Sequence, residues 1–191
     1  REGDALQDRF VYTAHPSRVV FGAGTLASLA DEVAALGCRR AFVLTTPQQR
    51  ATGADVVSRL GAVAAGLFSD AAMHTPLDVT ERALAAFEAA GADCTVAIGG
   101  GSTTGLGKAL ALRTDLPQVV VPTTYAGSEM TPILGQTEGG KKTTLRSPKV
   151  LPEVVLYDVD LTLTLPPGLS ATSGINAIAH AVEARYTRDR N

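Results

Sequence analysis

Three consecutive glycines, Gly99-Gly100-Gly101-Ser102, limit the possible fold of this chain more than any other feature. An apolar run over residues 94–98 precedes them, and a helical pattern over about 103–112 follows. Glycine allows close approach of the backbone to a ligand, and a helix start offers unpaired N–H groups. A strand, a glycine turn and a helix in this order indicate an α/β fold with a phosphate-binding turn. A tight turn without a ligand is the alternative, but it requires fewer glycines.

The glycine turn matches neither of the two common phosphate motifs. It lacks the GxGxxG spacing of the usual dinucleotide fold. A Walker loop is excluded because Lys108 comes too late and no Gly-Lys-Ser/Thr sequence exists.

Short apolar runs alternate with helical patterns along most of the chain. Strands are expected at 18–22, 41–45, 63–68, 94–98, 118–121 and 154–157, and helices between them. Thr25 is predicted to cap the first helix, and Asp78 with Glu81 to form a capping-box-like pair at the third. Residues 133–145 depart from this rhythm and predict an exposed β-hairpin around Gly139-Gly140. The order implies a doubly wound, mostly parallel sheet with helices on both faces.

A domain boundary is expected at Pro166-Pro167. Residues 1–166 then form an α/β domain that contains the phosphate-binding turn. Residues 167–191 form the first helix of a C-terminal helical domain, capped by Ser170 or Thr172. A lone helix makes no domain, so the remainder is expected to be absent from this chain or supplied from elsewhere.

Composition excludes several classes of protein. Hydrophobic residues make up 45% and charged residues 19%, which is typical of a globular protein. A formal net charge of −2 gives no basic surface for nucleic acid or an anionic membrane. No apolar run suits a membrane span or signal peptide, and Cys38 and Cys94 form no CxxC pair. A cytoplasmic location is therefore expected.

Two further motifs carry chemically useful side chains. Thr123, Thr124 and Ser128 follow the strand at 118–121, at the sheet edge where ligands of open α/β folds bind. Their alternative interpretation is an ordinary polar loop. Asn176 and His180 are four residues apart and share one helix face. A histidine packed against a neighbour is the more common outcome for such a residue.

These three motifs, in this order, resemble the iron-containing alcohol dehydrogenase superfamily from about Val19 to Tyr186. The resemblance implies a dinucleotide-binding domain followed by an all-helical domain, with the active site between them. Metal-dependent members carry Asp as a metal ligand where this chain has Asn176, and commonly Asp where Gly105 stands. The sequence Pro-Thr-Thr-Tyr-Ala-Gly-Ser-Glu also replaces the usual Pro-Thr-Thr-x-Gly-Thr-Gly-Ser-Glu. All three variants resemble the maleylacetate reductase branch.

That branch implies NADH- or NADPH-dependent reduction of maleylacetate to 3-oxoadipate in the breakdown of aromatic compounds, without a metal. Catalytic candidates implied by the resemblance are His180, Asn176 and Tyr125. Cofactor-binding candidates are Gly99, Gly100, Gly101, Ser102, Thr123, Thr124, Ser128, Lys142 and Thr46. The loop 45–48 has no acidic residue to repel a 2′-phosphate, so NADPH is expected to be tolerated, with help from Arg50. The substrate is then a dianionic oxo acid, and family members are commonly homodimers.

Three alternatives stay open at this point. The chain is part of a metal-dependent alcohol dehydrogenase with iron or zinc that tolerates Asn176. It is a nucleotide-binding fragment or subunit that is inactive alone. Or it belongs to a family member that acts on a different enone or keto substrate.

Overall fold

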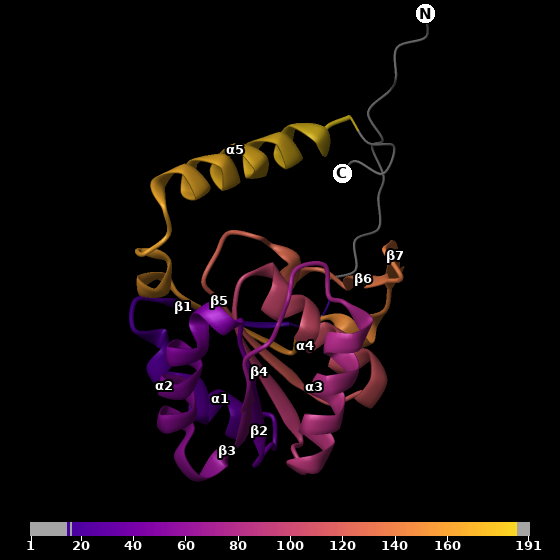
Figure 1. The fold of residues 1–191 in the computed structure, drawn as a ribbon. Coiled ribbons are helices and arrows are strands. Elements are labelled where there is room, and N and C mark those ends of the chain that lie inside the picture. The colour runs from indigo at the N-terminus through magenta and orange to yellow at the C-terminus, as the bar shows by residue number, and fades with distance from the viewer. Residues whose placement is uncertain (1–14, 16, 187–191) are drawn as a thin grey trace, which may run out of the picture. The chain divides into compact units, whose positions relative to one another are not determined.

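The computed structural model describes His15 and residues 17–186, which fall into two units (Figure 1). The larger unit, residues 17–164, is an α/β domain. The second unit contains the helix α5 (Pro167–Glu183).

The larger unit is built on one six-stranded sheet in which every pair of neighbouring strands is parallel. The strand order is β1-β8-β5-β4-β2-β3. Its members are β1 (Arg18–Gly22), β2 (Ala41–Leu44), β3 (Ala64–Phe68), β4 (Cys94–Gly99), β5 (Gln118–Pro122) and β8 (Val154–Asp158). The central strands β2, β4 and β5 are buried at every position, as expected when both faces are covered. The predicted α/β fold with a mostly parallel sheet is confirmed.

Helices cover both faces of this sheet (Figure 1). On one face, α1 (Leu29–Ala35) and α2 (Arg50–Leu60) pack through Val33 and Val56. On the other face, α3 (Leu77–Ala89) and α4 (Gly101–Thr114) pack through Phe87 and Leu110. β2 leads to a helix on one face and its parallel neighbour β4 to a helix on the other, and the order in which strands are added to the sheet reverses between them. This is a topological switch point, where open α/β sheets bind ligands.

A separate antiparallel hairpin extends between β5 and β8. It consists of β6 (Ile133–Glu138) and β7 (Lys141–Arg146), joined at Gly139 and Gly140, both with positive φ. The Thr137 amide donates to the Thr75 carbonyl at 3.3 Å, so the hairpin contacts the loop before α3. The hairpin matches the expectation from sequence.

Two predicted helix caps are wrong. The first helix begins with a 3-10 turn, Thr25–Ser28, and Gly24 is its N-cap residue. The Thr25 hydroxyl instead donates to the carbonyls of Gly22 and Tyr157. The Asp158 carboxylate, from the far end of the chain, accepts the amides of Gly24 and Leu26 at 3.0 and 2.9 Å. A capping group from so distant a position leaves no local signal.

The third helix is also capped differently from the prediction. Pro76 is the N-cap residue of α3, with no side-chain cap bond, so Asp78 lies inside the first turn. Its negative charge still favours the positive end of the helix dipole.

Helix α5 begins earlier than expected. It starts at Pro167 rather than after Ser170 or Thr172, because proline at the first helical position has its φ preset and loses no hydrogen bond. None of its described side chains is buried. In the part of the chain that the structure describes, no helix combines the length and apolarity needed to cross a membrane.

Candidate functional site

The glycine turn lies where β4 passes into α4, at the carboxyl edge of the sheet. Gly99 has a φ of 148°, and a Cβ there would lie 2.5 Å from the Thr103 hydroxyl. Gly100 is the N-cap residue, and its carbonyl accepts the amides of Thr103 and Thr104. Within residues 17–186, the amides of Gly101 and Ser102 have no acceptor. The turn therefore presents unpaired donors at the positive end of a 14-residue helix.

Two observations test whether this turn suits a diphosphate. Gly101 is exposed, and its nearest obstacle to an added Cβ is the Ala126 methyl at 3.6 Å, so the first helical turn is accessible. The Thr103 hydroxyl is fully buried beside Gly99 and has no hydrogen-bond partner among the described residues. Open amides and a spare hydroxyl fit a polyanionic ligand.

Gln49 joins the loops that follow three strands. It belongs to the 3-10 turn Pro47–Gln49 after β2, and its amide nitrogen donates to the Thr123 hydroxyl after β5 at 3.0 Å. Between them, the Gly99 carbonyl accepts the Thr123 amide at 2.9 Å. A Cβ on Gly99 would lie 2.6 Å from the Gln49 side-chain oxygen, so this side chain can keep its position only beside a glycine. The sequence analysis missed Gln49, although its place directly after a buried strand was a usable signal.

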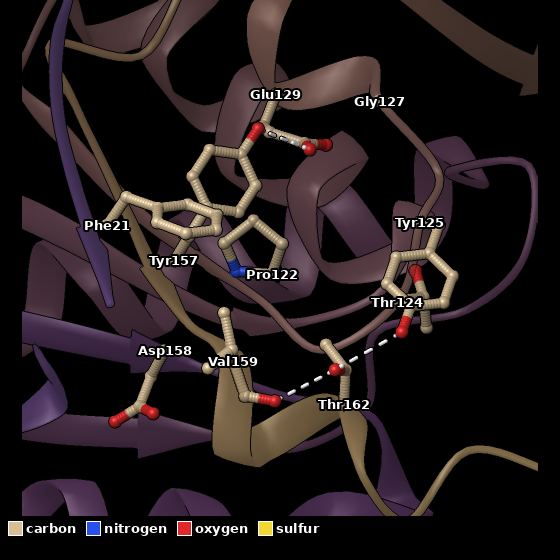
Figure 2. Close-up of a pocket in the computed structure, with 10 residues that line it drawn as sticks. All are labelled: Phe21, Pro122, Thr124, Tyr125, Gly127, Glu129, Tyr157, Asp158, Val159 and Thr162. Carbon is tan, nitrogen blue, oxygen red and sulfur yellow. Dashed lines mark hydrogen bonds between the residues drawn. The ribbon is translucent and has the colours of Figure 1, made fainter. Parts of the chain in front are cut away.

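A pocket of about 380 Å³ opens at the carboxyl ends of β5, β8 and β1 (Figure 2). Phe21 and Tyr157 form one aromatic side, with ring centroids 6.1 Å apart. Figure 2 shows Tyr157 bonded to Glu129 and, across the pocket, Tyr125 bonded to Thr162. The residues that line the pocket are Phe21, Pro122, Thr124, Tyr125, Gly127, Glu129, Tyr157, Asp158, Val159 and Thr162. An aromatic cavity with a few polar groups is typical of a small-molecule site.

Two of the residues that line the pocket, Glu129 and Tyr157, are ionisable and hydrogen-bonded to each other. The Glu129 carboxylate is 3% exposed and accepts the Tyr157 hydroxyl at 2.8 Å. Burial, together with this carboxylate, raises the pKa of Tyr157 well above its usual value, so the phenol stays protonated. Burial also lowers the pKa of Lys108 to about 8, while the charge of Glu129 acts in the opposite direction.

Three of the other predicted cofactor residues lie in the loops at this edge, whereas the fourth, Lys142, lies on the separate hairpin. Thr124 lines the pocket, and Ser128 begins the 3-10 turn Ser128–Met130. Thr46 precedes the turn of Gln49, and its hydroxyl lies 3.4 Å from the Gln49 side-chain oxygen. Lys142 is exposed on β7, opposite Thr137.

Arg50, expected to help with a 2′-phosphate, donates from Nε to the Ser69 hydroxyl at 2.9 Å. A guanidinium has five N–H donors, so this bond uses only one of them.

The predicted catalytic residues lie in both units. Tyr125 is 52% exposed at the pocket, and its hydroxyl donates to Thr162 at 3.3 Å. Asn176 and His180 lie on α5, in the second unit, one helical turn apart. His180 Nδ1 lies 3.6 Å from a Glu183 carboxylate oxygen, and both side chains are largely exposed. The structure thus brings the glycine turn, Gln49 and the loop after β5 together.

Among the described residues, Cys38, Asp93 and Cys94 have ligand atoms close enough to share a metal ion. These residues lie near the amino ends of β2 and β4. Both oxygens of Asp93 already accept backbone amides, from Arg39 and Arg40. Burial raises the pKa of both thiols, which disfavours the thiolates that a metal requires.

Comparison with known proteins agrees with this geometry. The sequence is 65% identical over 182 residues to maleylacetate reductase of Rhizobium sp., covering 95% of this chain and 52% of that protein. It is 57% identical to maleylacetate reductase of Sphingobium indicum, covering 96% of this chain and 52% of that protein. The crystal structure of maleylacetate reductase from Agrobacterium tumefaciens matches with a TM-score of 0.94 and 64% identity, covering 96% of this chain and 52% of the other. The chain thus spans about half the length of the relatives it matches.

A sequence model described as iron-containing alcohol dehydrogenase matches residues 16–159. That range contains all six strands of the parallel sheet, the glycine turn and both residues of the Gln49–Thr123 hydrogen bond. It also contains most of the residues that line the pocket. The chain therefore belongs to the iron-containing alcohol dehydrogenase family.

Proposed function

We propose that this chain is the nucleotide-binding part of an enzyme that uses NADH or NADPH to reduce maleylacetate to 3-oxoadipate. The observation that carries the proposal is the glycine turn with the unpaired amides of Gly101 and Ser102 at the switch point of the sheet. Its relatives named maleylacetate reductase, two of them 65% and 57% identical to it, support this substrate.

We infer the direction of a bound dinucleotide across the sheet from the strand order. With the diphosphate at α4, its two halves extend to opposite sides. The resemblance assigns the adenine ribose to the loop after β2, which holds Thr46 and Gln49. The nicotinamide half then lies over β5 and β8, where the pocket of Tyr125 and Tyr157 opens.

Bound NAD(P)H would supply the hydride that reduces the activated double bond. The chain's own residues then stabilise the negative charge that develops on the substrate carbonyl oxygen. Asn176 and His180, one turn apart on α5, and Tyr125 at the pocket have N–H or O–H donors for this role. His180 is the candidate that delivers a proton to carbon, because an imidazole ring nitrogen can act as a general acid.

Metal independence is part of this proposal and rests on Asn176. An amide is a weaker ligand for a hard divalent cation than the carboxylate that metal-dependent members carry at this place. The competing function is a metal-dependent alcohol dehydrogenase. By the same resemblance, we propose a cytoplasmic homodimer.

Nucleotide binding tests the first part of the proposal. Calorimetry with this chain is expected to detect NADH, and Gly101→Pro, which removes an amide donor, is expected to weaken binding. Gly168→Ala, in the other unit, is the control. An intact wild-type chain with no affinity for NADH or NADPH contradicts the proposal.

Turnover by the longer protein tests the second part. We expect maleylacetate-dependent NADH or NADPH oxidation that survives a chelator, and a lower kcat in His180→Ala with little change in cofactor affinity. Activity that is lost on chelation and restored by iron or zinc supports the metal-dependent alternative. Undiminished turnover of His180→Ala removes His180 from the mechanism.

A further inference from the structure

Lys108 occupies an unusual place for a lysine in a phosphate-binding helix. It lies two turns after Gly101 on α4, about 10 Å along the helix axis, and is 1% exposed. Its ammonium group donates to the carbonyls of Ser128, Thr131 and Ile133 and to the Thr131 hydroxyl, at 2.5 to 3.2 Å. An ammonium has three N–H donors, so these four acceptors leave none for a phosphate.

The residues that accept hydrogen bonds from Lys108 lie in or directly after the loop that lines the pocket. Ser128 and Thr131 end the loop that begins at Thr123, and Ile133 begins β6. The same loop carries Thr124 and Tyr125 into the pocket. A buried ammonium is costly unless such oxygens surround it, and buried carbonyls without a donor are costly as well. The loop conformation and the Lys108 position therefore depend on each other.

We infer that Lys108 is a positioning residue that holds residues 123–131 against α4 and thereby sets the nicotinamide half of the cofactor site. This inference rests on the proposed function. The diphosphate turn consists of α4 backbone and does not include Lys108, whereas the pocket loop is held by it. Removing Lys108 should therefore affect the two halves of a dinucleotide differently.

Two neighbouring contacts fit the same role. Glu129, in the 3-10 turn near the end of the loop, accepts the Tyr157 hydroxyl from β8, and so joins the loop to the sheet. The Thr131 hydroxyl donates to the Ser128 carbonyl at 3.0 Å while accepting from Lys108. The loop is thus held from α4 on one side and from β8 on the other.

The test compares ADP, which carries only adenosine and the diphosphate, with NADH, which adds the nicotinamide riboside. In Lys108→Met, which keeps the length and removes the donors, we expect ADP affinity within about twofold of wild type. NADH affinity is expected to fall roughly tenfold, which is the size of effect that the loss of one hydrogen bond to the ligand would have. Arg113→Met, at a basic residue near the end of the same helix, is the matched control and should leave both affinities unchanged.

A second variant keeps the test valid if Lys108→Met does not fold. Thr131→Val preserves the shape of the side chain and removes one acceptor of Lys108. It should therefore also lower NADH affinity, but by a smaller factor than Lys108→Met does. Calorimetry of both ligands on the 191-residue chain gives the readout, with thermal unfolding as a check of folding.

The outcomes separate the two proposals. Equal losses of ADP and NADH affinity, no loss of either in both variants, or a wild type that binds NADH no more tightly than ADP would overturn the role of Lys108. A folded wild type that binds neither ligand contradicts the proposed function itself.

Discussion

Gly105 determines how closely α4 approaches the loop that precedes α3. A Cβ at this position would lie 2.4 Å from the Thr75 hydroxyl. Thr75 is buried and, like His74 before it, has a positive φ, which is uncommon for a β-branched residue. Its carbonyl also accepts the Thr137 amide of the hairpin at 3.3 Å, which holds its backbone in place. The Asp that metal-dependent family members carry here would require a different position of Thr75.

Gly105→Ala is predicted to lower the free energy of unfolding by about 1–3 kcal/mol, the usual effect of overpacking, less the gain in helix propensity. Gly107→Ala on the same helix is the control, because its new Cβ would lie 3.4 Å from the nearest atom, in ordinary contact. Urea unfolding of both variants measures the difference. Equal stabilities of the two would show that the Thr75 contact is not restrictive.

At the scale of elements, an ion pair joins the edge strand β1 to helix α1. Arg18 donates to both oxygens of Glu32, at 2.6 and 3.0 Å, and the Glu32 side chain is largely buried. The guanidinium lowers the pKa of Glu32 below its ordinary value near 4.5, although burial acts in the opposite direction. A lowered pKa in the folded state stabilises the fold above the unfolded value. That stabilisation is lost as pH falls through the folded pKa.

We therefore expect Arg18→Met to lower the Tm at pH 7, with a difference from wild type that shrinks as pH falls below about 4.5. Arg59→Met is the matched control, because its pair with Asp55 is exposed at both partners and contributes little. Thermal scans from pH 7 to 3 measure both differences. A constant difference across this range would show that the pair does not govern it.

The elements themselves were largely predictable, whereas their caps were not. Apolar periodicity and glycine punctuation are local, and they located each strand within one or two residues. The cap of the first helix comes from Asp158, far along the chain, so no pattern around Thr25 reveals it. The same limit applies to Lys108, whose acceptors lie 20 to 25 residues away.

At the scale of the whole molecule, the two units differ in the share of their residues that is buried. The strands β4 and β5 are buried at every residue, whereas α5 has no buried side chain among its described residues. Exposed apolar side chains on α5 include Ile175 at 68% and Ile178 at 64%. Tertiary packing supplies most of the stability of a helix, so a helix of this kind is marginally stable.

Hydrogen exchange on the 191-residue chain is expected to show α5 exchanging quickly and β4 and β5 exchanging slowest, near the rate of global unfolding. Mass spectrometry of peptides from each element, at several exchange times, gives the comparison. Helix α3, which is buried on one face only, serves as the intermediate reference. Protection of α5 equal to that of β4 would contradict this and show that the helix is covered.

The sequence by itself determined the parallel α/β fold, the hairpin at Gly139-Gly140 and the glycine turn Gly99-Gly100-Gly101 between a strand and a helix, because these follow from local periodicity and local backbone freedom. Only the tertiary structure decided that β1 pairs with β8, that Gln49 reaches Thr123, and that Lys108 turns inward to the loop of the pocket. Each of these joins residues far apart in the chain. Their energies depend on burial and on complementary partners that no local window contains.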